Sequence, residues 1–235
     1  MTVSDVTLPL IVRNHLKGGV LSDGVCHAES INGMDYAAVW QEMKEFTRVR
    51  DVGTADEVWL LEHAPIFTLG QAGDASHLLD VGDIPVLKVD RGGQATYHGP
   101  GQIMLYLLAD LTRLGLGVRS LVENMEAAVV ASLADYGIDS ASSRQAPGVY
   151  IEGKKIAALG LRISRGCSYH GLCFNFDFDT TVFDRINPCG DADMKITQLR
   201  EQLSPLPSQS EVAARLVASL ASALGYARTE WVDAA

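Results

Sequence analysis

A glycine-rich stretch of twelve residues constrains the fold of this chain more than any other part of the sequence. It runs from Arg91 to Gln102, reads RGGQATYHGPGQ, and lies between apolar runs at 84–89 and 103–108. Four glycines and a proline at this density exclude an ordinary helix or a central strand. The stretch is typical either of a long hairpin loop or of a backbone that approaches a ligand closely and presents N–H groups to it. Spacing alone leaves both interpretations open.

Helices are predicted where apolar residues recur every three or four positions. This spacing occurs over 34–49, 121–136 and 212–224. Two capping-box patterns mark helix starts: Ser120 with Glu123, and Ser208 with Glu211. Glycine follows the second and third helices, at Gly137 and Gly225, where a C-terminal cap is expected.

Short apolar runs bounded by turn residues predict strands. They cover 9–12, 58–61, 66–69, 84–89 and 103–108, and a hairpin is predicted over 149–163. Apolar and polar residues then alternate over 172–178, which indicates a half-buried antiparallel strand. These elements predict an α+β fold, with a mixed, mostly antiparallel sheet flanked by helices. We expect one domain over residues 31–235, preceded by an N-terminal segment, 1–30, of uncertain structure.

Composition excludes several classes of function. The net charge of −10 argues against nucleic-acid binding, because no overall basic field would hold phosphates. No apolar run approaches the ~20 residues of a membrane span, and the N-terminus lacks a secretion signal. We therefore expect a cytoplasmic protein with reduced cysteines and no membrane association. Cys167, His170 and Cys173 have a metal-like spacing, but alternation along a strand would point His170 away from the two cysteines, so no metal site is predicted.

Two residues stand out as candidates for chemistry. Cys189 lies between Pro188 and Gly190, in a turn where a cysteine contributes little to a core. A thiolate nucleophile needs a nearby cation or base, and no histidine or lysine adjoins Cys189 in the sequence. Lys155 enters an apolar strand, where partial desolvation would lower its pKa and make it usable as a base. The alternative for Lys155 is an edge-strand lysine that reaches water.

Several motifs, in this order, resemble the lipoyl(octanoyl) transferase family, within the biotin/lipoate protein ligase catalytic-domain superfamily. They are the glycine-rich stretch itself, the segment 153–163 with Lys155, RGCSYHG at 165–171, and NPCG at 187–190. The resemblance covers about 60–200. It implies an α+β fold around a mixed sheet and an acyltransferase that needs no metal, ATP or other cofactor.

The resemblance also implies site residues and partners. Cys189 is expected to carry an acyl thioester, and Lys155 to favour its thiolate and serve as acid/base. The expected donor is octanoyl-acyl carrier protein, and the acceptors are lipoyl domains of 2-oxoacid dehydrogenase complexes and the glycine cleavage H protein. The segments expected to bind substrate contain Arg91, Gly92, Gly93, Gln94, Ala95, Thr96, Tyr97, His98, Ala158, Leu159, Gly160, Gly171, Leu172 and Cys173.

Three alternatives stay open from the sequence. An ATP-dependent lipoate or biotin ligase of the same superfamily would act on an acyl-adenylate, and Cys189 would be incidental. A binding module for a carrier protein or a lipid would need the pocket but not the thiol. A hydrolase would use water as the acceptor.

Overall fold

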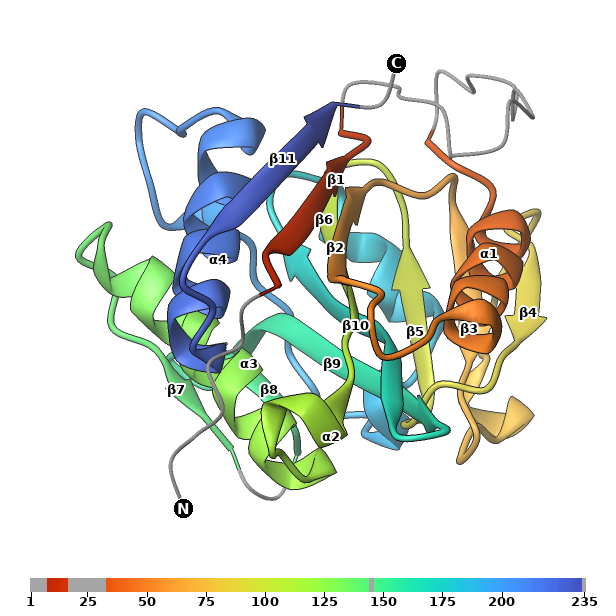
Figure 1. Ribbon diagram of the computed structural model, residues 1–235. Coiled ribbons are helices and arrows are strands. Elements are labelled where there is room, and N and C mark those ends of the chain that lie inside the picture. Colours follow the sequence, from red (N-terminus) through yellow and green to blue (C-terminus); the bar gives the residue numbers. More distant parts are fainter. Residues whose placement is uncertain (1–7, 17–32, 144–145, 234–235) are drawn as a thin grey trace.

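The computed structural model describes residues 8–16, 33–143 and 146–233 (Figure 1). Within these residues a mixed eight-stranded sheet has the order β11-β1-β2-β6-β10-β9-β8-β7. The pairs β1–β2 and β1–β11 are parallel, and the remaining pairs are antiparallel. The strands are β1 (Leu10–Asn14), β2 (Asp56–Leu61), β6 (Gln102–Leu108), β7 (Ala141–Ser142), β8 (Gly148–Ile151), β9 (Lys154–Ser164), β10 (Cys167–Asn175) and β11 (Thr229–Asp233). The predicted α+β class with a mostly antiparallel sheet is confirmed.

A second, smaller sheet has the order β4-β3-β5. Its strands are β3 (Ile66–Leu69), β4 (Val86–Lys88) and β5 (Ala95–His98). The helices are α1 (Tyr36–Val49), α2 (Leu111–Leu114), α3 (Val118–Ala134) and α4 (Gln209–Leu224). Part of the glycine-rich stretch thus forms β5, a short edge strand, which is compatible with the exclusion of a central strand.

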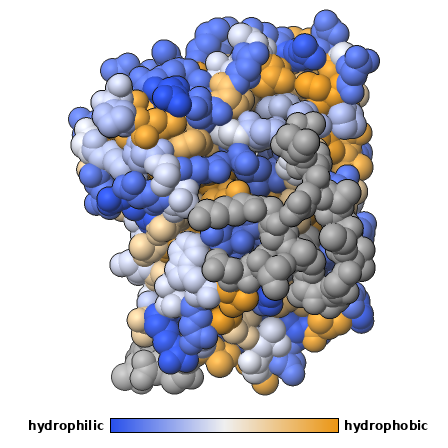
Figure 2. Space-filling view, turned by 90° about the horizontal axis from the view of Figure 1, so that it is seen from above, coloured by the Kyte–Doolittle hydropathy of each residue, from blue (hydrophilic) through white to orange (hydrophobic). Residues whose placement is uncertain are grey.

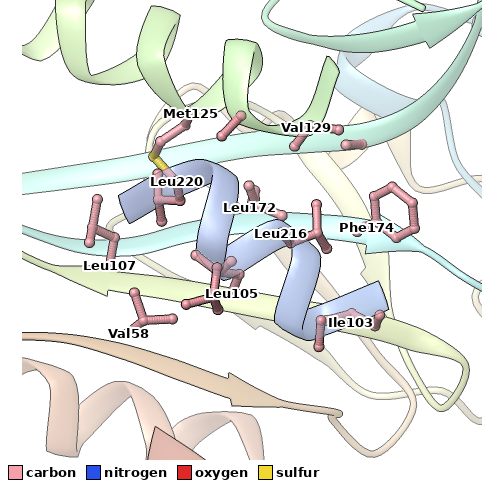
Figure 3. Packing of buried hydrophobic residues seen from close by; sticks show 14 of the residues in the cluster. Val58, Ile103, Leu105, Leu107, Met125, Val129, Leu172, Phe174, Leu216 and Leu220 are labelled. Atoms are coloured by element: carbon pink, nitrogen blue, oxygen red, sulfur yellow. The ribbon is translucent and has the colours of Figure 1, made fainter. Parts of the chain in front are cut away.

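Both faces of the eight-stranded sheet are covered, which explains why β6 is buried throughout. Alternate residues of β6, beginning with Ile103, face α3 and α4, where Met125 and Leu216 pack against the same core (Figure 3). The intervening residues, Met104, Tyr106 and Leu108, face α1. A strand buried on both faces shows a continuous apolar run rather than alternation.

The helix ends agree only in part with the predicted caps. Ser208 accepts the N–H of Glu211 at the start of α4, and Gly225 ends that helix with a positive φ, as predicted. The capping box predicted at Ser120 is wrong, because α3 begins two residues earlier, with Gly117 at its N-cap. Glu123 instead forms an ion pair with Arg119, one turn away on the exposed face.

Three strands differ from their predictions. β10 is buried throughout and ends at Asn175, so the half-buried strand expected over 172–178 is wrong. Its polar residues are buried because β6 and β9 flank β10 and both of its faces are covered. The run 84–89 forms only β4, an edge strand with Val86 39% exposed. β11 has no predicted counterpart, and it pairs with β1 at the edge of the large sheet.

β1 belongs to the N-terminal segment 1–30, yet Leu10 and Val12 are fully buried in the main core. The rest of that segment, including Cys26, lies outside the described residues apart from 8–9 and 15–16. In the part of the chain that the structure describes, no helix is long and apolar enough to cross a membrane. The face in Figure 2 is largely hydrophilic, with smaller apolar areas between.

Candidate active site

The first half of the glycine-rich stretch is a loop held between the two sheets. The guanidinium of Arg91 donates hydrogen bonds to the carbonyl oxygens of Thr68 and Gln94, both at 2.8 Å, and to that of Gly92 at 2.9 Å. The N–H of Gly92 donates to Leu161 O on β9 at 2.8 Å. The loop is therefore fixed to β3 on one side and to β9 on the other.

Folding brings Cys189 and Lys155 together although they are 34 residues apart in the sequence. Cys189 lies on the 3₁₀ turn Pro188–Gly190 with a left-handed backbone, φ 57°. Its Sγ is 3.1 Å from Lys155 Nζ. Left-handed non-glycine residues are uncommon and concentrate at functional sites.

Lys155 is not an edge-strand lysine. β9 lies between β8 and β10, and the side chain of Lys155 is 2% exposed. Burial lowers its pKa, but the interactions with the neighbouring Cys189 sulfur and Tyr150 side chain together outweigh burial, and the net pKa shift is upward. Desolvation acts in the predicted direction, but the predicted net lowering of this pKa is wrong: Lys155 is an ammonium at neutral pH, paired with Cys189.

The ammonium of Lys155 is also held from the side of β8. Its Nζ donates to Pro147 O at 3.2 Å and lies 5.3 Å from the centre of the Tyr150 ring. The next N–H along, that of Gly148, donates to the buried carboxylate of Glu126 on α3 at 2.7 Å. Helix α3 thus fixes the loop that positions Lys155.

A pocket opens beside Cys189. It lies between the large sheet and the loop before β5, and we call it the acyl pocket. Most of the expected substrate-binding residues line it: Arg91, Gly93, Gln94, Ala95, Thr96, His98, Ala158, Leu159, Gly160, Gly171, Leu172 and Cys173. Gly92 and Lys155 line an adjoining groove instead. Tyr97 faces away from both and packs against Phe67 and Phe183.

One end of the acyl pocket is a buried polar cluster that the sequence did not predict as a unit. His63 Nε2 is 2.7 Å from the Tyr106 hydroxyl, and Tyr36 stacks on His98 with ring centres 5.3 Å apart. His170 Nε2 lies 3.0 Å from Asp90 Oδ1. Of these side chains only His98 and His170 were candidates from the sequence, because the others come from elements without a recognisable motif.

Burial keeps the histidines of this cluster neutral. It lowers the pKa of His63 to about 4, and that of His98 well below 6.5. Burial also lowers the pKa of His170, although the Asp90 carboxylate opposes the shift. Desolvation by itself would raise the pKa of Asp90, but hydrogen bonds from His170, Tyr169 and Trp40 hold it below its usual range.

The backbone of His170 breaks the alternation of β10. His170 has a left-handed φ of 60°, and its side chain reaches Asp90, as does that of its neighbour Tyr169. The predicted direction of His170 is therefore wrong: it lines the acyl pocket together with Cys173. Among the described residues, no group of three or more His, Cys, Asp or Glu side chains is placed to hold a metal ion.

The other described cysteines differ from Cys189 in their surroundings. Cys167, Cys173 and Cys189 are all free thiols. Burial raises the pKa of Cys173 to about 12 and also raises that of Cys167. Neither has a lysine partner in the hydrogen bonds of the described residues, so Cys189 is the thiol best placed to act as a nucleophile.

The sequence of this chain was compared with protein-family models and with known proteins. The model of the lipoyl protein ligase A/B catalytic domain matches residues 35–221. The chain belongs to this family. A curated relative, an octanoyltransferase of Ectopseudomonas mendocina, is 56% identical over 83% of this chain and 95% of its own length. An octanoyltransferase of Shewanella loihica is 49% identical over 89% of this chain and 96% of its own length.

A solved structure shows a similar fold. A bi-partite lipoate protein ligase of Thermoplasma acidophilum superposes with a TM-score of 0.70 over 96% of this chain and 86% of that one. Only 14% of its residues are identical, so this likeness concerns the fold alone.

Proposed function

We propose that this enzyme transfers an octanoyl group from octanoyl-acyl carrier protein to a lysine of a lipoyl domain, through a thioester on Cys189. The curated relatives at 49–56% identity are octanoyltransferases, which does not favour the ATP-dependent ligase alternative. The observation that carries the mechanism is the distance of 3.1 Å between Lys155 Nζ and Cys189 Sγ, at the pocket that Cys189 lines.

In the first step the Cys189 thiolate attacks the thioester carbonyl of the donor. The bond between Cys189 Sγ and the acyl carbon forms, and the bond from that carbon to the donor sulfur breaks. The departing thiolate takes a proton from the Lys155 ammonium, which leaves Lys155 neutral. The raised pKa of Lys155 suits this order of events, because the amine is protonated before the acyl group arrives.

In the second step the neutral amine of the acceptor lysine attacks the Cys189 thioester. Lys155, now neutral, takes the proton from the attacking nitrogen, and Cys189 leaves as a thiolate beside the restored ammonium. Exchange between two thioesters is nearly neutral in energy, whereas amide formation is downhill and drives the overall transfer.

Both steps pass through an oxyanion that needs hydrogen-bond donors. Backbone N–H groups of the glycine-rich loop are suitable donors. The side-chain amide of Gln94 is another, because it lies against Gly190, where a Cβ would come within 2.7 Å of the amide nitrogen.

The lining of the acyl pocket suits a hydrocarbon chain. Met104, Ala158, Leu159 and Leu172 supply an apolar lining, and Gly160 lets the loop at Gly92 lie close against β9, since a Cβ there would be 3.0 Å from Gly92 O. Burial of each methylene contributes roughly 0.8 kcal/mol, so octanoyl is favoured over acetyl by about 5 kcal/mol. The acceptors we propose are lipoyl domains of 2-oxoacid dehydrogenase complexes and the glycine cleavage H protein.

Intact mass spectrometry tests this function. Incubation with octanoyl-acyl carrier protein, without ATP, should add one octanoyl group to the wild-type enzyme and none to Cys189→Ala. Addition of a lipoyl domain should discharge the adduct onto that domain. Free octanoate with ATP should give no product. Transfer by the ATP route, or full activity of Cys189→Ala, would refute the proposal, and release of free octanoate alone would identify a hydrolase.

A further inference from the structure

Cys189 borders two cavities rather than one. Besides the acyl pocket, it lines a groove on the outer side of Lys155, which Val118 and Val122 of α3 border together with Pro147 and Leu161. We call this the α3 groove. Val118 is 49% exposed, so the groove is open to solvent at that end. The site residues predicted from the sequence that touch this groove are Gly92, Gly93, Gln94, Lys155, Leu159, Gly160 and Cys189.

The acyl pocket and the α3 groove correspond to the two sides of a thioester substrate. When the Cys189 sulfur attacks the acyl carbon, the acyl chain extends to one side of that carbon and the donor sulfur with its substituent to the other. The acyl pocket takes the first half. The α3 groove is the other cavity that Cys189 lines in the described residues, and it is bordered by Lys155, which protonates the departing sulfur.

The chemistry of the groove suits an uncharged, flexible substituent. Its lining contains no carboxylate, and its charged side chain is Lys155, which already pairs with Cys189. The valines of α3, with Pro147 and Leu161, offer apolar contacts, and the neighbouring glycine backbone offers amide groups. A chain of methyl, methylene and amide groups can make both kinds of contact without placing a second charge beside the Lys155 ammonium.

We propose that the α3 groove binds the pantetheine arm of the acyl donor, with Val118 and Val122 as contacts for its apolar part. This inference rests on the proposed function, since it assumes a thioester donor. The arm would extend from the sulfur beside Lys155 along the first turns of α3 toward solvent, where a carrier protein would sit. Val118 and Val122 are one helical turn apart and share a face.

Two donors that differ only in the arm test the proposal. Single-turnover acylation of Cys189 is measured with octanoyl-pantetheine and with octanoyl-N-acetylcysteamine, which lacks most of the arm. The wild-type enzyme should react with the higher kcat/KM on the pantetheine donor. In Val118→Asp and Val122→Asp, the ratio of kcat/KM on octanoyl-pantetheine to kcat/KM on octanoyl-N-acetylcysteamine should fall at least fivefold, because a carboxylate desolvates poorly beside the apolar arm.

Val118→Asp suits the fold, because Val118 is the first residue of α3 and an acidic residue in the first turn of a helix interacts favourably with the helix dipole. Val122 lies in the second turn and is partly exposed. Val49→Asp, at the end of α1 and 56% exposed, is the matched control and should keep the wild-type ratio. Circular dichroism and melting curves would confirm that all three variants are folded.

An unchanged ratio in both α3 variants, with normal acylation, would overturn this inference and leave the proposed function intact. The inference would also be overturned if the ratio persisted while KM for the lipoyl domain rose, because the groove would then serve the acceptor lysine. If neither donor acylated wild-type Cys189, the proposed function would fail and the inference with it.

Discussion

The carboxylate of Glu126 on α3 accepts the backbone N–H of Gly148, and the adjacent carbonyl, that of Pro147, accepts from Lys155 Nζ. Gly148 has a positive φ, and a Cβ there would lie within 2.7 Å of Ala157 O. The backbone at 147–148 therefore connects the Lys155 ammonium, which we propose for catalysis, to helix α3.

Replacement of Glu126 should separate its acceptor role from its charge. Burial raises the pKa of Glu126, so the charged form is disfavoured in the folded protein, although the Gly148 N–H opposes this. Glu126→Gln keeps an acceptor and should change stability little, whereas Glu126→Ala leaves the Gly148 N–H unpaired and should cost about 1–3 kcal/mol. Urea denaturation gives the stabilities. Equal losses in both variants would show that the charge, not the acceptor, matters.

Glu126→Ala should also slow acylation of Cys189, because Lys155 is then less well placed beside the attacking sulfur. The Gln variant serves as the control for both measurements. If Glu126→Ala were acylated at the wild-type rate, at a temperature where the variant is fully folded, the positioning role of Glu126 would be excluded.

Removal of the Lys155 ammonium should shift the pH dependence of acylation. Lys155→Met preserves volume but not charge, and the thiol of Cys189 must then ionise without a cation at 3.1 Å. We expect acylation to slow by roughly 10²–10⁴-fold and its rate to keep rising at higher pH than in the wild type. Adding Cys189→Ala should remove the rest, and Lys155→Met should add little to that variant. Superimposable pH profiles would show that another group activates Cys189.

Arg91 should be important for stability as well as turnover. It lines the acyl pocket, but its guanidinium donates to backbone oxygens of Thr68, Gly92 and Gln94, so it shapes the loop. Arg91→Lys keeps the charge without the planar fork and should cost about 2 kcal/mol, with a raised KM for the acyl donor. Thermal melts and steady-state kinetics check this. An unchanged melting temperature with reduced turnover would assign Arg91 to the ligand alone.

The buried histidines should make the protein sensitive to mild acid. The pKa of His63 is about 4 in the folded state, against 6.5 for an ordinary histidine. Between these pH values the unfolded chain binds more protons, so the free energy of unfolding falls as the pH is lowered from 6.5 to 4 and levels off below. One histidine contributes a slope of at most about 1.4 kcal/mol per pH unit.

His63→Gln should therefore reduce the slope of the free energy of unfolding against pH in this range, by at most the contribution of one proton. The substitution also weakens the fold at neutral pH, because it disturbs the hydrogen bond with the Tyr106 hydroxyl. Denaturation curves at several pH values between 4 and 7 give the slope. Parallel curves for wild type and variant would show that other groups cause the acid sensitivity.

Gly171 is expected to tolerate no side chain. A Cβ at this position of β10 would collide with the carbonyl oxygen of Leu105 on β6. Gly171→Ala should force these two central strands apart and destabilise the protein by several kcal/mol, by analogy with severe overpacking. Gly53→Ala, where the nearest atom is 3.5 Å from the added carbon, is the control. Similar melting temperatures for both variants would contradict this expectation.

The fold class and several local features were predictable because they depend on short-range patterns. Glu152 and Gly153 both have positive φ, as the tight turn of the predicted hairpin requires. Ser208 was predictable as a cap from its spacing to Glu211 alone. β11 was not predictable, because a polar edge strand such as Thr229–Asp233 has neither alternation nor an apolar run, and its existence depends on pairing with β1.

The site was predictable in its parts but not in its assembly. Residue type and flanking turns singled out Cys189 and Lys155, but no local pattern predicts a distance of 3.1 Å across 34 residues. The sign of the Lys155 pKa shift depended on that distance. Likewise, Asp90 and Tyr36 come from separate parts of the chain, and His170 reaches them through a left-handed φ that a strand pattern does not reveal.

The acyl pocket lies on the seam between the two sheets, with the loop before β5 on one side and β6, β9 and β10 on the other. A hydrocarbon chain in this seam would complete a hydrophobic interior that the polypeptide leaves open. The acyl group is attached to Cys189 in the folded and the unfolded chain alike, so its burial in the folded state alone adds to the free energy of unfolding. The acyl-enzyme should accordingly melt at a higher temperature than the free enzyme, and the rise should vanish as the acyl group is passed on.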